Sequence, residues 1–573
     1  MIDPVSVSGP IDEALYLADL HKRQQKAWPA GIPRGPVYPF GEVALTEYLR
    51  QWARKTPEKT LFNFYGREIS FAEIDLLSDQ CAAMLQDTGV RPGDRVAVFL
   101  GNCPQFAVAF FGILKAGAVH VPVNPMFKEH ELLYELQDTD ATVMIADHAL
   151  VPLALEVQDQ SSVARIFGTG LAEMIPAVPT IPVPDAVLQS PASSQADPFL
   201  PAVMAAGEPT PVTPDLDDVA ALNYTGGTTG MPKGCVHTQR DMIYTAATAC
   251  ITNCPSGPDD VVVNFYPLFW IAGEDLGLIL PVFSGATCIL MARWDALGYM
   301  TAVDRYKVTR AVLLVDNAAE LLDHPRLGEF DLTSFRTSGV SSFVKKLNKD
   351  FRDRWRDLTG ATIAELSYGM TETHTCDSFT FGFQDDDFDL SLQPILCGLP
   401  VPGTEFKICD FETHELLPIG AEGEICVRSP SNLKSYWNKP DATAESIVNG
   451  WLRTGDIGMI NENGMLHFLG RRKEMLKVKG MSVFPAELEA LLGRHPAIVG
   501  SGVIGRPDAD RGQVPVAFVL IDPDKSEGIT EDALTAWCRD AMAVYKRPEI
   551  RIVETLPMTA TGKVKKHELE ALL

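Results

Sequence analysis

Short apolar strands and amphipathic helices alternate near the start of this chain, and this alternation limits the fold more than any other feature. Residues 95–100, 119–123 and 141–145 are apolar runs of strand length, and residues 104–116 have the pattern of an apolar helix. Strands that are separated by helices usually pair in parallel and are covered by those helices. The sequence therefore predicts an α/β fold with layered sheets.

The length of 573 residues exceeds what one hydrophobic core usually supports, so we expect two or more domains. Residues 175–216 are rich in Pro, Ala and Ser, and we predict a surface excursion of the large domain there. Beyond residue 485, a predicted helix, a strand at 514–521 and a helix after Thr530 form a segment of domain size.

A loop rich in glycine and threonine, Tyr224 to Gly234, directly follows a predicted strand at 219–222. Glycine has no Cβ and accepts positive φ, so the backbone N–H groups of such a loop can turn toward phosphate oxygens. Threonine hydroxyls and Lys233 add donors that suit a triphosphate. The spacing is that of neither the P-loop nor the dinucleotide-binding loop. Alone, the pattern fits a phosphate cradle or a plain surface turn.

Two later segments combine a glycine turn with a carboxylate. Glu372, within residues 365–373, could hold Mg²⁺ through an oxygen, and Asp456, within residues 450–456, could accept both hydroxyls of a ribose. A helix N-terminal acid and a turn aspartate are equally ordinary roles for these residue types.

The C-terminal part of the chain carries two lysine-bearing segments. Residues 470–480 form a dense basic run, which is also typical of an exposed hairpin. Residues 556–563 are a loop of small residues that ends in Lys563. Such a loop can move and deliver its lysine elsewhere, or it can simply be a frayed terminal turn.

The composition excludes several classes of partner. A formal charge of -26 argues against a nucleic-acid or anionic-membrane surface, because such partners require clustered Lys and Arg. The eleven cysteines show no CxxC pairs, which fits a reducing, cytoplasmic setting without a zinc site. We expect neither a signal peptide in residues 1–30 nor a transmembrane helix, because the longest uncharged runs are broken by polar residues and proline.

Taken together, the order and chemistry of these segments resemble those of the adenylate-forming superfamily, and the acyl-CoA synthetase branch in particular. The resemblance extends from about Val43 to Leu573. It implies a large N-terminal domain of stacked α/β subdomains with a small β-barrel (residues 1–472) and a small, mobile α+β C-terminal domain (residues 473–573). It also implies ATP, Mg²⁺ and coenzyme A as ligands.

The resemblance assigns roles to individual residues. Lys563, Thr371 and Glu372 would be catalytic, with Glu372 holding Mg²⁺. Ser338-Gly339-Val340 stands where the family has a Gly-Ala-Pro segment beside adenine. The implied nucleotide-binding residues are Thr225, Gly226, Gly227, Thr228, Thr229, Gly230, Lys233, Gly339, Glu365, Ser367, Tyr368, Gly369, Thr371, Asp456, Arg471 and Lys563.

In this family the small domain rotates between two half-reactions. The hinge position corresponds to Lys473, where many synthetases have aspartate. Lys477, Gly480 and Met481 would lie on the face that forms the thioester with CoA. The expected partners are the carboxylic acid, ATP and CoA, and a homodimer is left open.

The aromatic segment 266–273 corresponds to the wall of the acid pocket in this family, although core packing would also explain its composition. The implied pocket residues are Phe269, Trp270, Gly273 and Gly339. No aspartate occupies the place that binds the ammonium group in amino-acid-activating relatives. We therefore expect a medium- or long-chain fatty acid, with an aryl acid as the alternative acid and a carrier protein as the alternative acceptor.

Overall fold

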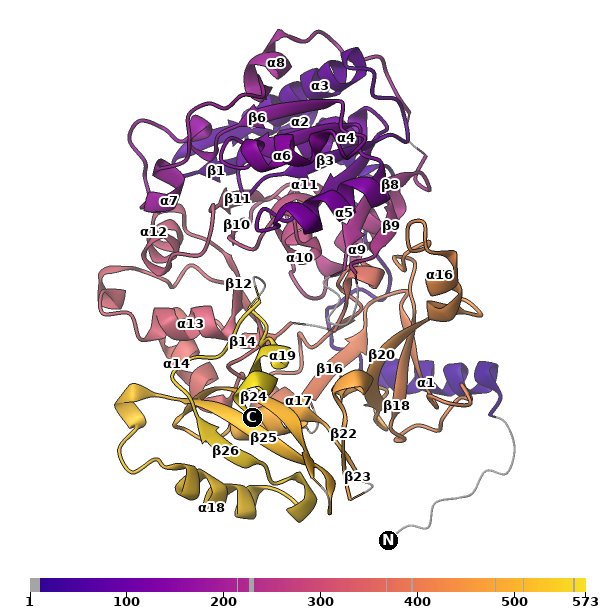
Figure 1. Ribbon diagram of the computed structural model, residues 1–573, viewed down its shortest axis with the longest axis vertical. Helices are drawn as coiled ribbons and strands as arrows, with labels where there is room; N and C mark the ends of the chain where they lie inside the picture. The colour runs from indigo at the N-terminus through magenta and orange to yellow at the C-terminus, as the bar shows by residue number, and fades with distance from the viewer. Residues whose placement is uncertain are drawn as a thin grey trace.

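The protein, as a computed structural model, is described for residues 11–213, 215–225, 231–366, 368–392, 395–479, 481–508, 510–559 and 562–573. Within these ranges the chain builds four β-sheets with flanking helices (Figure 1). Two sheets are largely parallel, the third is antiparallel, and the fourth belongs to the C-terminal residues. This arrangement confirms the predicted α/β class.

The first parallel sheet has seven strands in the order β7-β6-β5-β3-β4-β8-β9. All neighbours pair in parallel except β8 and β9, which form an antiparallel hairpin. Helix α4 (Pro104–Lys115) is buried along its whole length, which explains why its sequence is apolar except for Gln105 and Lys115. The strands are β3 (Arg95–Phe99), β4 (Val119–Pro122), β5 (Val143–Asp147), β6 (Arg165–Thr169), β7 (Asp197–Pro198), β8 (Val219–Tyr224) and β9 (Gly234–Thr238).

The second parallel sheet has the order β14-β13-β12-β10-β11-β1-β2, with only β1 and β2 antiparallel. The carboxyl ends of β12, β13 and β14 therefore meet at one edge, where ligands of open α/β sheets usually bind. The strands are β1 (Thr60–Phe64), β2 (Arg67–Ser70), β10 (Val261–Asn264), β11 (Thr287–Leu290), β12 (Arg310–Leu314), β13 (Thr337–Ser341) and β14 (Ile363–Glu365).

The third sheet is antiparallel and is formed by residues 378–471. It is the part of the large domain that corresponds to the expected small barrel. Its order is β15-β16-β21-β20-β18-β17, with β19 beside β20. The strands are β15 (Ser378–Phe379), β16 (Ile395–Pro400), β17 (Glu405–Cys409), β18 (Gly423–Arg428), β19 (Ile447–Val448), β20 (Trp451–Ile460) and β21 (Leu466–Arg471).

The C-terminal sheet lies at the lower end of the molecule in Figure 1 and has the order β23-β22-β25-β24, with β26 parallel to β25. The basic run therefore leads into the hairpin of β22 and β23. Its elements are β22 (Leu476–Val478), β23 (Met481–Val483), α17 (Pro485–Leu492), β24 (Ile498–Asp508), β25 (Gly512–Ile521), α18 (Glu531–Ala541), β26 (Glu549–Ile552) and α19 (Lys566–Leu569).

Helix starts follow local signals in the sequence. The Ser70 hydroxyl accepts the Glu73 N–H at 3.1 Å and opens α3 (Phe71–Asp87), and Gly89 follows that helix with φ +95. Thr530 caps α18 in the same way. Other helices are α1 (Glu13–Ala27), α2 (Leu45–Lys55), α5 (Glu129–Thr139), α6 (Val151–Gln158), α9 (Gln239–Ala249), α10 (Ile271–Glu274), α11 (Leu280–Ser284), α12 (Ala296–Tyr306), α13 (Val315–Leu322), α14 (Lys349–Thr359), α15 (Phe388–Ser391) and α16 (Pro440–Ser446).

The Pro-rich excursion at 175–216 is more ordered than its composition indicates. It contains α7 (Asp185–Leu188), β7 and α8 (Phe199–Ala205), and Phe199 and Val203 are fully buried. Burial of these two side chains anchors the excursion to the large domain. Among the described residues, no helix is both long and apolar enough to cross a membrane.

Candidate active site

The two ends of the Gly/Thr loop are fastened to each other by the hairpin of β8 and β9. The Thr225 N–H donates to the Lys233 carbonyl at 3.0 Å, and the Lys233 N–H donates to the Thr225 hydroxyl at 3.3 Å. Gly226, Gly227, Thr228, Thr229 and Gly230 lie outside the described residues. The loop thus begins at the end of β8 and ends at the start of β9, and these two strands are hydrogen-bonded to each other.

Lys233 and Glu372 meet at one aromatic residue, Tyr436. The Lys233 Nζ lies 4.3 Å from the centre of the Tyr436 ring, and the Tyr436 hydroxyl donates to Glu372 Oε1 at 2.9 Å. Burial, with the Glu372 charge as a further cause, raises the pKa of Tyr436. The sequence analysis did not single out Tyr436.

Tyr436 reaches this position because its segment runs beside β9. The Val236 N–H donates to the Ser435 carbonyl at 3.0 Å, and the Trp437 N–H donates to the Gly234 carbonyl at 2.8 Å. A short aromatic segment in a loop is too common to signal such a long-range pairing.

The Thr371–Glu372 turn is held by two contacts to its backbone carbonyls. His237 Nε2 lies 2.7 Å from the Thr371 carbonyl oxygen, and the Leu433 N–H donates to the Glu372 carbonyl at 2.7 Å. A Cβ placed on Gly369 would lie 1.1 Å from the Thr375 carbonyl oxygen, so the chain can close here only with glycine. The side chains of Thr371 and Glu372 remain half-buried.

Glu365 ends β14, and its carboxylate is occupied by protein groups. It accepts the Ser342 N–H at 2.8 Å and also the Ser342 hydroxyl. Burial raises the pKa of Glu365. Glu365 therefore braces the strand end, and Ser367 lies outside the described residues.

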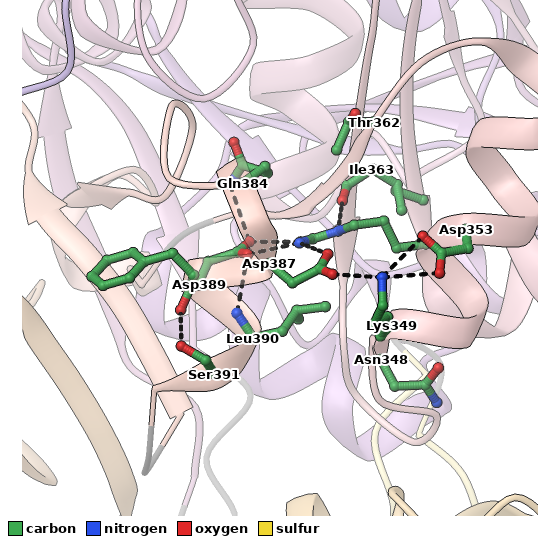
Figure 2. Close-up of polar contacts among 12 residues, drawn as sticks. Asn348, Lys349, Asp353, Thr362, Ile363, Gln384, Asp387, Asp389, Leu390 and Ser391 are labelled. Carbon is green, nitrogen blue, oxygen red and sulfur yellow. Dashed lines mark hydrogen bonds and ion pairs between the residues drawn. The ribbon is translucent and has the colours of Figure 1, made fainter.

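A buried arginine, Arg352, is hydrogen-bonded to β14. The Arg352 Nε–H donates to the Ile363 carbonyl at 3.0 Å, and the guanidinium pairs with Asp389 at 2.6 Å and Asp387 at 3.1 Å. Figure 2 shows this network with Ile363, Asp387 and Asp389, together with Gln384, whose Nε2 donates to Asp389 Oδ2 at 3.1 Å. The strand that leads into residues 365–373 is thus tied to α14 and α15.

Asp456 contacts two further polar side chains, those of Tyr368 and Arg471. The Tyr368 hydroxyl donates to Asp456 Oδ2 at 2.8 Å, and Arg471 Nε lies 3.0 Å from Asp456 Oδ1. Asp456 and Arg471 are direct partners across β20 and β21, so the sheet register sets this contact. Burial raises the pKa of Asp456, and the Arg471 charge opposes that rise.

Lys563 belongs to the C-terminal domain and extends toward the large domain. Its loop is closed by the Thr559 N–H, which donates to the Lys563 carbonyl at 2.7 Å, and by Gly562 with φ +79. The Lys563 Nζ lies 5.2 Å from the centre of the Phe343 ring in the large domain.

The surroundings of Lys563 affect its charge. The side chain is still accessible to solvent, but protein atoms crowd its ammonium group. This desolvation lowers the pKa of Lys563, and the Arg471 charge lowers it further, while Asp456 opposes both. Lys563, Arg471 and Asp456 therefore interact electrostatically in the described arrangement.

The aromatic segment 266–273 follows β10 of the second sheet, and its Trp270 contacts Phe343, the residue beside Lys563. Trp270 precedes α10, is half-buried, and packs with its ring centre 6.1 Å from that of Tyr266 and 6.4 Å from that of Phe343. Phe269 is also half-buried. A Cβ on Gly273 would lie 1.9 Å from the Pro267 carbonyl oxygen, so this glycine is required for the close turn.

A cavity opens between α11 and the strands β10, β12, β13 and β14. Its lining includes Gly339 and Glu365, but not Phe269, Trp270 or Gly273. A Cβ on Gly339 would lie 2.3 Å from Leu366 Cδ2, so a larger residue would narrow the space. Lining residues that the sequence analysis missed include Tyr266, Arg310, Val312, Thr337 and Leu366.

The predicted CoA-side residues lie on the β22–β23 hairpin, apart from the segment that carries Lys563 (Figure 1). Lys477 Nζ donates to the Ser482 hydroxyl at 3.0 Å, and Met481 is exposed. Lys473 is exposed just before this hairpin, and Gly480 lies outside the described residues.

The fold and the clustered lysine, carboxylate and arginine side chains define a nucleotide-using enzyme with two domains. The family model described as AMP-binding enzyme matches residues 49–437, and that of the AMP-binding enzyme C-terminal domain matches residues 487–563. The chain belongs to the AMP-binding enzyme family, which confirms the predicted adenylate-forming class.

Two relatives illustrate the range within this family. A long-chain-fatty-acid–CoA ligase of Bacillus subtilis (strain 168) is 31% identical over 96% of this chain and 98% of its own length. A 4-coumarate–CoA ligase of Oryza sativa subsp. japonica is 33% identical over 89% of this chain and 88% of its own length.

Solved structures agree with this assignment. An anthranilate CoA ligase in complex with anthranoyl-AMP has a TM-score of 0.80 at 27% identity and covers 94% of this chain and 98% of its own. ATP-bound MatB from Rhodopseudomonas palustris has a TM-score of 0.78 at 26% identity, covering 92% of this chain and 99% of its own.

Proposed function

We propose that this chain, an ATP-dependent acyl-CoA ligase of the acid–thiol ligase class, takes a medium- or long-chain fatty acid as its substrate. The Bacillus subtilis relative, which aligns over 96% of the chain, is named for long-chain fatty acids and supports this choice. An aryl acid is the second candidate, because the rice relative is named for 4-coumarate.

The observation that carries the site assignment is that Lys563 of the C-terminal segment reaches the large domain, where its Nζ lies 5.2 Å from the centre of the Phe343 ring, while Asp456 and Arg471 are paired at 3.0 Å across β20 and β21. A carboxylate oxygen of the acid attacks the α-phosphorus of ATP, and pyrophosphate leaves with the electron pair of the broken P–O bond. Lys563 donates to the negative charge that develops there. Asp456 accepts from the ribose hydroxyls, and Arg471 orients Asp456.

The phosphates that leave are held at the other end of the site. Lys233, together with the Gly/Thr loop and Thr371, binds the β- and γ-phosphates, and Tyr368 and Gly369 line the adenine side. We assign Gly339, which lines the cavity beside α11, to both the nucleotide side and the acid pocket.

Glu372 is the residue that would hold Mg²⁺. Its side chain is half-buried, and its Oε1 accepts the Tyr436 hydroxyl at 2.9 Å, so this carboxylate is the protein oxygen ligand that we assign to the metal. This fits Mg²⁺, which usually keeps waters and substrate phosphates as its other ligands. When bound, Mg²⁺ neutralises part of the phosphate charge.

In the second half-reaction the CoA thiol attacks the acyl carbon and AMP leaves. We take the domains to be residues 1–472 and 473–573, with the hinge at Lys473; β21 ends at Arg471 and the next sheet begins at Leu476, which supports this boundary. After rotation, Lys477, Gly480 and Met481 form the thioester side.

The proposal includes a cytoplasmic location, which the cysteine-containing, largely buried core supports because free thiols persist in reducing compartments. The acid, ATP and CoA are the partners. A homodimer is the oligomeric form to test, by light scattering of the purified protein.

A panel of fatty and aryl acids, assayed for CoA-dependent release of AMP with multiple turnovers, tests the function. Medium- or long-chain fatty acids should give the highest kcat/KM. If aryl acids exceed them, the substrate class changes; if only a carrier protein supports turnover, CoA is not the acceptor.

A further inference from the structure

A segment of the large domain, residues 342–347 between β13 and α14, packs against the C-terminal domain. Its Val344 side chain is 6% exposed. Val344 is buried in an apolar cluster whose other buried members belong to the C-terminal domain and are Ile504, Val516, Phe518, Leu556 and Leu569. Among the described residues, Val344 is therefore the member of this cluster that the large domain contributes.

The C-terminal domain comes close to this segment at two glycines. A Cβ placed on Gly500 of β24 would lie 2.6 Å from Val344 Cγ1, and a Cβ on Gly493, which follows α17, would lie 2.9 Å from Lys346 Cγ. Both distances are shorter than the usual contact of about 3.5–4.0 Å between carbon atoms. Glycine at these positions thus allows the two domains to pack directly against each other.

Hydrogen bonds within the large domain fix the segment from which Val344 extends. The Glu365 carboxylate at the end of β14 accepts both the N–H and the hydroxyl of Ser342. The Lys346 Nζ donates to the carbonyls of Ser342 and Phe343 at 3.0 Å and 3.1 Å. The large domain therefore holds Val344 in place independently of its contacts with the C-terminal domain.

The cluster that receives Val344 also supports the loop that carries Lys563. Leu556 lies in the cluster just before this loop, and Val564, which directly follows Lys563, packs against the cluster. An antiparallel bridge between Met558 and Val564 closes the loop. Both ends of the loop are thus anchored on the side chains that Val344 contacts.

The residue before Val344 contacts the loop itself. The Phe343 ring centre lies 5.2 Å from the Lys563 Nζ, and a Cβ on Gly562 would lie 3.8 Å from Phe343 Cδ2. Two consecutive residues of the large domain therefore meet the C-terminal domain, one at the lysine loop and the other at the cluster that anchors the loop. The place of Lys563 on the large domain depends on both contacts.

We propose that Val344 is a positioning residue for adenylation: its insertion into the C-terminal cluster holds that domain in the orientation in which Lys563 reaches the large domain. The inference rests on the proposed two half-reactions. In the second half-reaction the β22–β23 hairpin, and not the lysine loop, is assigned to the reacting side. The Val344 contact should therefore serve the first half-reaction alone.

Val344→Asp tests this, because it places a carboxylate among apolar side chains and leaves the core of the large domain intact. We expect acid-dependent exchange of pyrophosphate into ATP to slow about tenfold or more, since burial of a valine side chain shifts an equilibrium by at least that factor. Formation of acyl-CoA from CoA and the synthetic acyl-adenylate should stay near the wild-type rate. Both assays use the acid that wild type prefers in the panel above.

The matched control is Val544→Asp, which introduces the same charge on the surface of the C-terminal domain. Val544 is 74% exposed, so this variant should keep the wild-type rate in both assays. A general loss of folded protein would lower both rates of Val344→Asp together. The split between the two assays therefore separates positioning from stability.

A second pair of variants acts on the same contact from the C-terminal domain. Gly500→Ala would place its Cβ against Val344 and should slow exchange about fivefold or more, because an overpacked contact must shift. Val344→Ala removes the Cγ1 that this Cβ would meet. The double variant Gly500→Ala/Val344→Ala should therefore exchange faster than Gly500→Ala alone. This pair decides the question if Val344→Asp does not fold.

The inference would be overturned by normal exchange in Val344→Asp, by equal losses in its two half-reactions, or by a double variant no faster than Gly500→Ala. Failure of the proposed function is distinguishable from these outcomes. If wild type forms no acyl-CoA from acyl-adenylate and CoA, CoA ligation is refuted, whereas exchange in the single and double variants still measures the role of Val344.

Discussion

The Tyr436 hydroxyl donates to Glu372 Oε1 at 2.9 Å while the Lys233 Nζ lies 4.3 Å from the centre of the same ring. One aromatic side chain thus connects the residue proposed to bind phosphate with the residue proposed to hold Mg²⁺. Its pKa is raised by burial and by Glu372, so the hydroxyl stays protonated and remains a donor at neutral pH.

Tyr436→Phe should therefore weaken the metal site more than the phosphate site. It removes the hydrogen bond to the carboxylate, which is worth about 1.5–3 kcal/mol, and keeps the aromatic ring beside Lys233. We expect a rise of about tenfold in the Mg²⁺ concentration that half-activates pyrophosphate exchange. Tyr436→Leu removes both contacts and should also raise the KM for ATP; equal behaviour of the two variants would contradict separate roles for hydroxyl and ring.

Lys563→Ala should nearly abolish adenylation. Removing one donor aimed at developing charge costs about 10²–10³ in rate in comparable sites. The readout is acid-dependent exchange of pyrophosphate into ATP at saturating substrates. Lys565→Ala is the matched control, because Lys565 pairs with Glu568 at 2.8 Å on the surface and should leave the rate unchanged. Equal exchange rates in wild type and Lys563→Ala would show that Lys563 has no role in adenylation.

Local signals predicted much of the fold. The apolar runs became β3, β4 and β5, and Ser70 and Thr530 cap helices as their sequence context indicates. Such features depend on a few neighbouring residues, so they can be seen in one sequence.

The contacts that complete the site could not be predicted in this way. Tyr436 and Glu372 are 64 positions apart and meet only because the segment of Tyr436 pairs along β9. Arg310 lies in an ordinary strand, and its place in the cavity follows from the register with Thr337. Lys563, Asp456 and Arg471 each stand in a local motif, but the electrostatic influence of Arg471 and Asp456 on Lys563 depends on how the two domains meet.

The pH dependence of adenylation should follow the charge of Lys563. Its pKa is lowered by desolvation and by Arg471, so the protonated, donating form is lost as pH rises through a value below the usual 10.5. Arg471→Gln should move this alkaline limb to higher pH, and Asp456→Asn should move it to lower pH. Profiles of kcat for pyrophosphate exchange at saturating ATP measure both shifts, and shifts of the same sign would contradict this electrostatic account.

Trp270→Ala should change which acid is preferred. Trp270 packs between Tyr266, which lines the cavity, and Phe343, which lies beside Lys563, so its removal should widen the space near the reacting end. We expect bulkier or aryl acids to gain relative kcat/KM. Trp294→Ala is the control, because Trp294 packs against Phe265 and Tyr299. An unchanged acid profile in Trp270→Ala would leave Trp270 with packing alone.

The ion pairs of Arg352 with Asp387 and Asp389 should stabilise the large domain next to β14. Arg352 is fully buried and paired with Asp389, whose side chain is 3% exposed, so Arg352→Met leaves a buried carboxylate without its cation. Breaking such a pair costs about 3–5 kcal/mol, whereas Arg354→Met, which breaks an exposed pair with Asp323, should cost about 0–1 kcal/mol.

Urea unfolding followed by tryptophan fluorescence can measure this difference, because the buried Trp355 lies in the same helix and donates to the Ser338 hydroxyl at 3.0 Å. The folded fraction of Arg352→Met should also show a higher KM for ATP, since the Arg352 bond to the Ile363 carbonyl fixes the strand that ends at Glu365. Equal unfolding midpoints for the two variants would mean that the network drawn in Figure 2 does not stabilise the large domain.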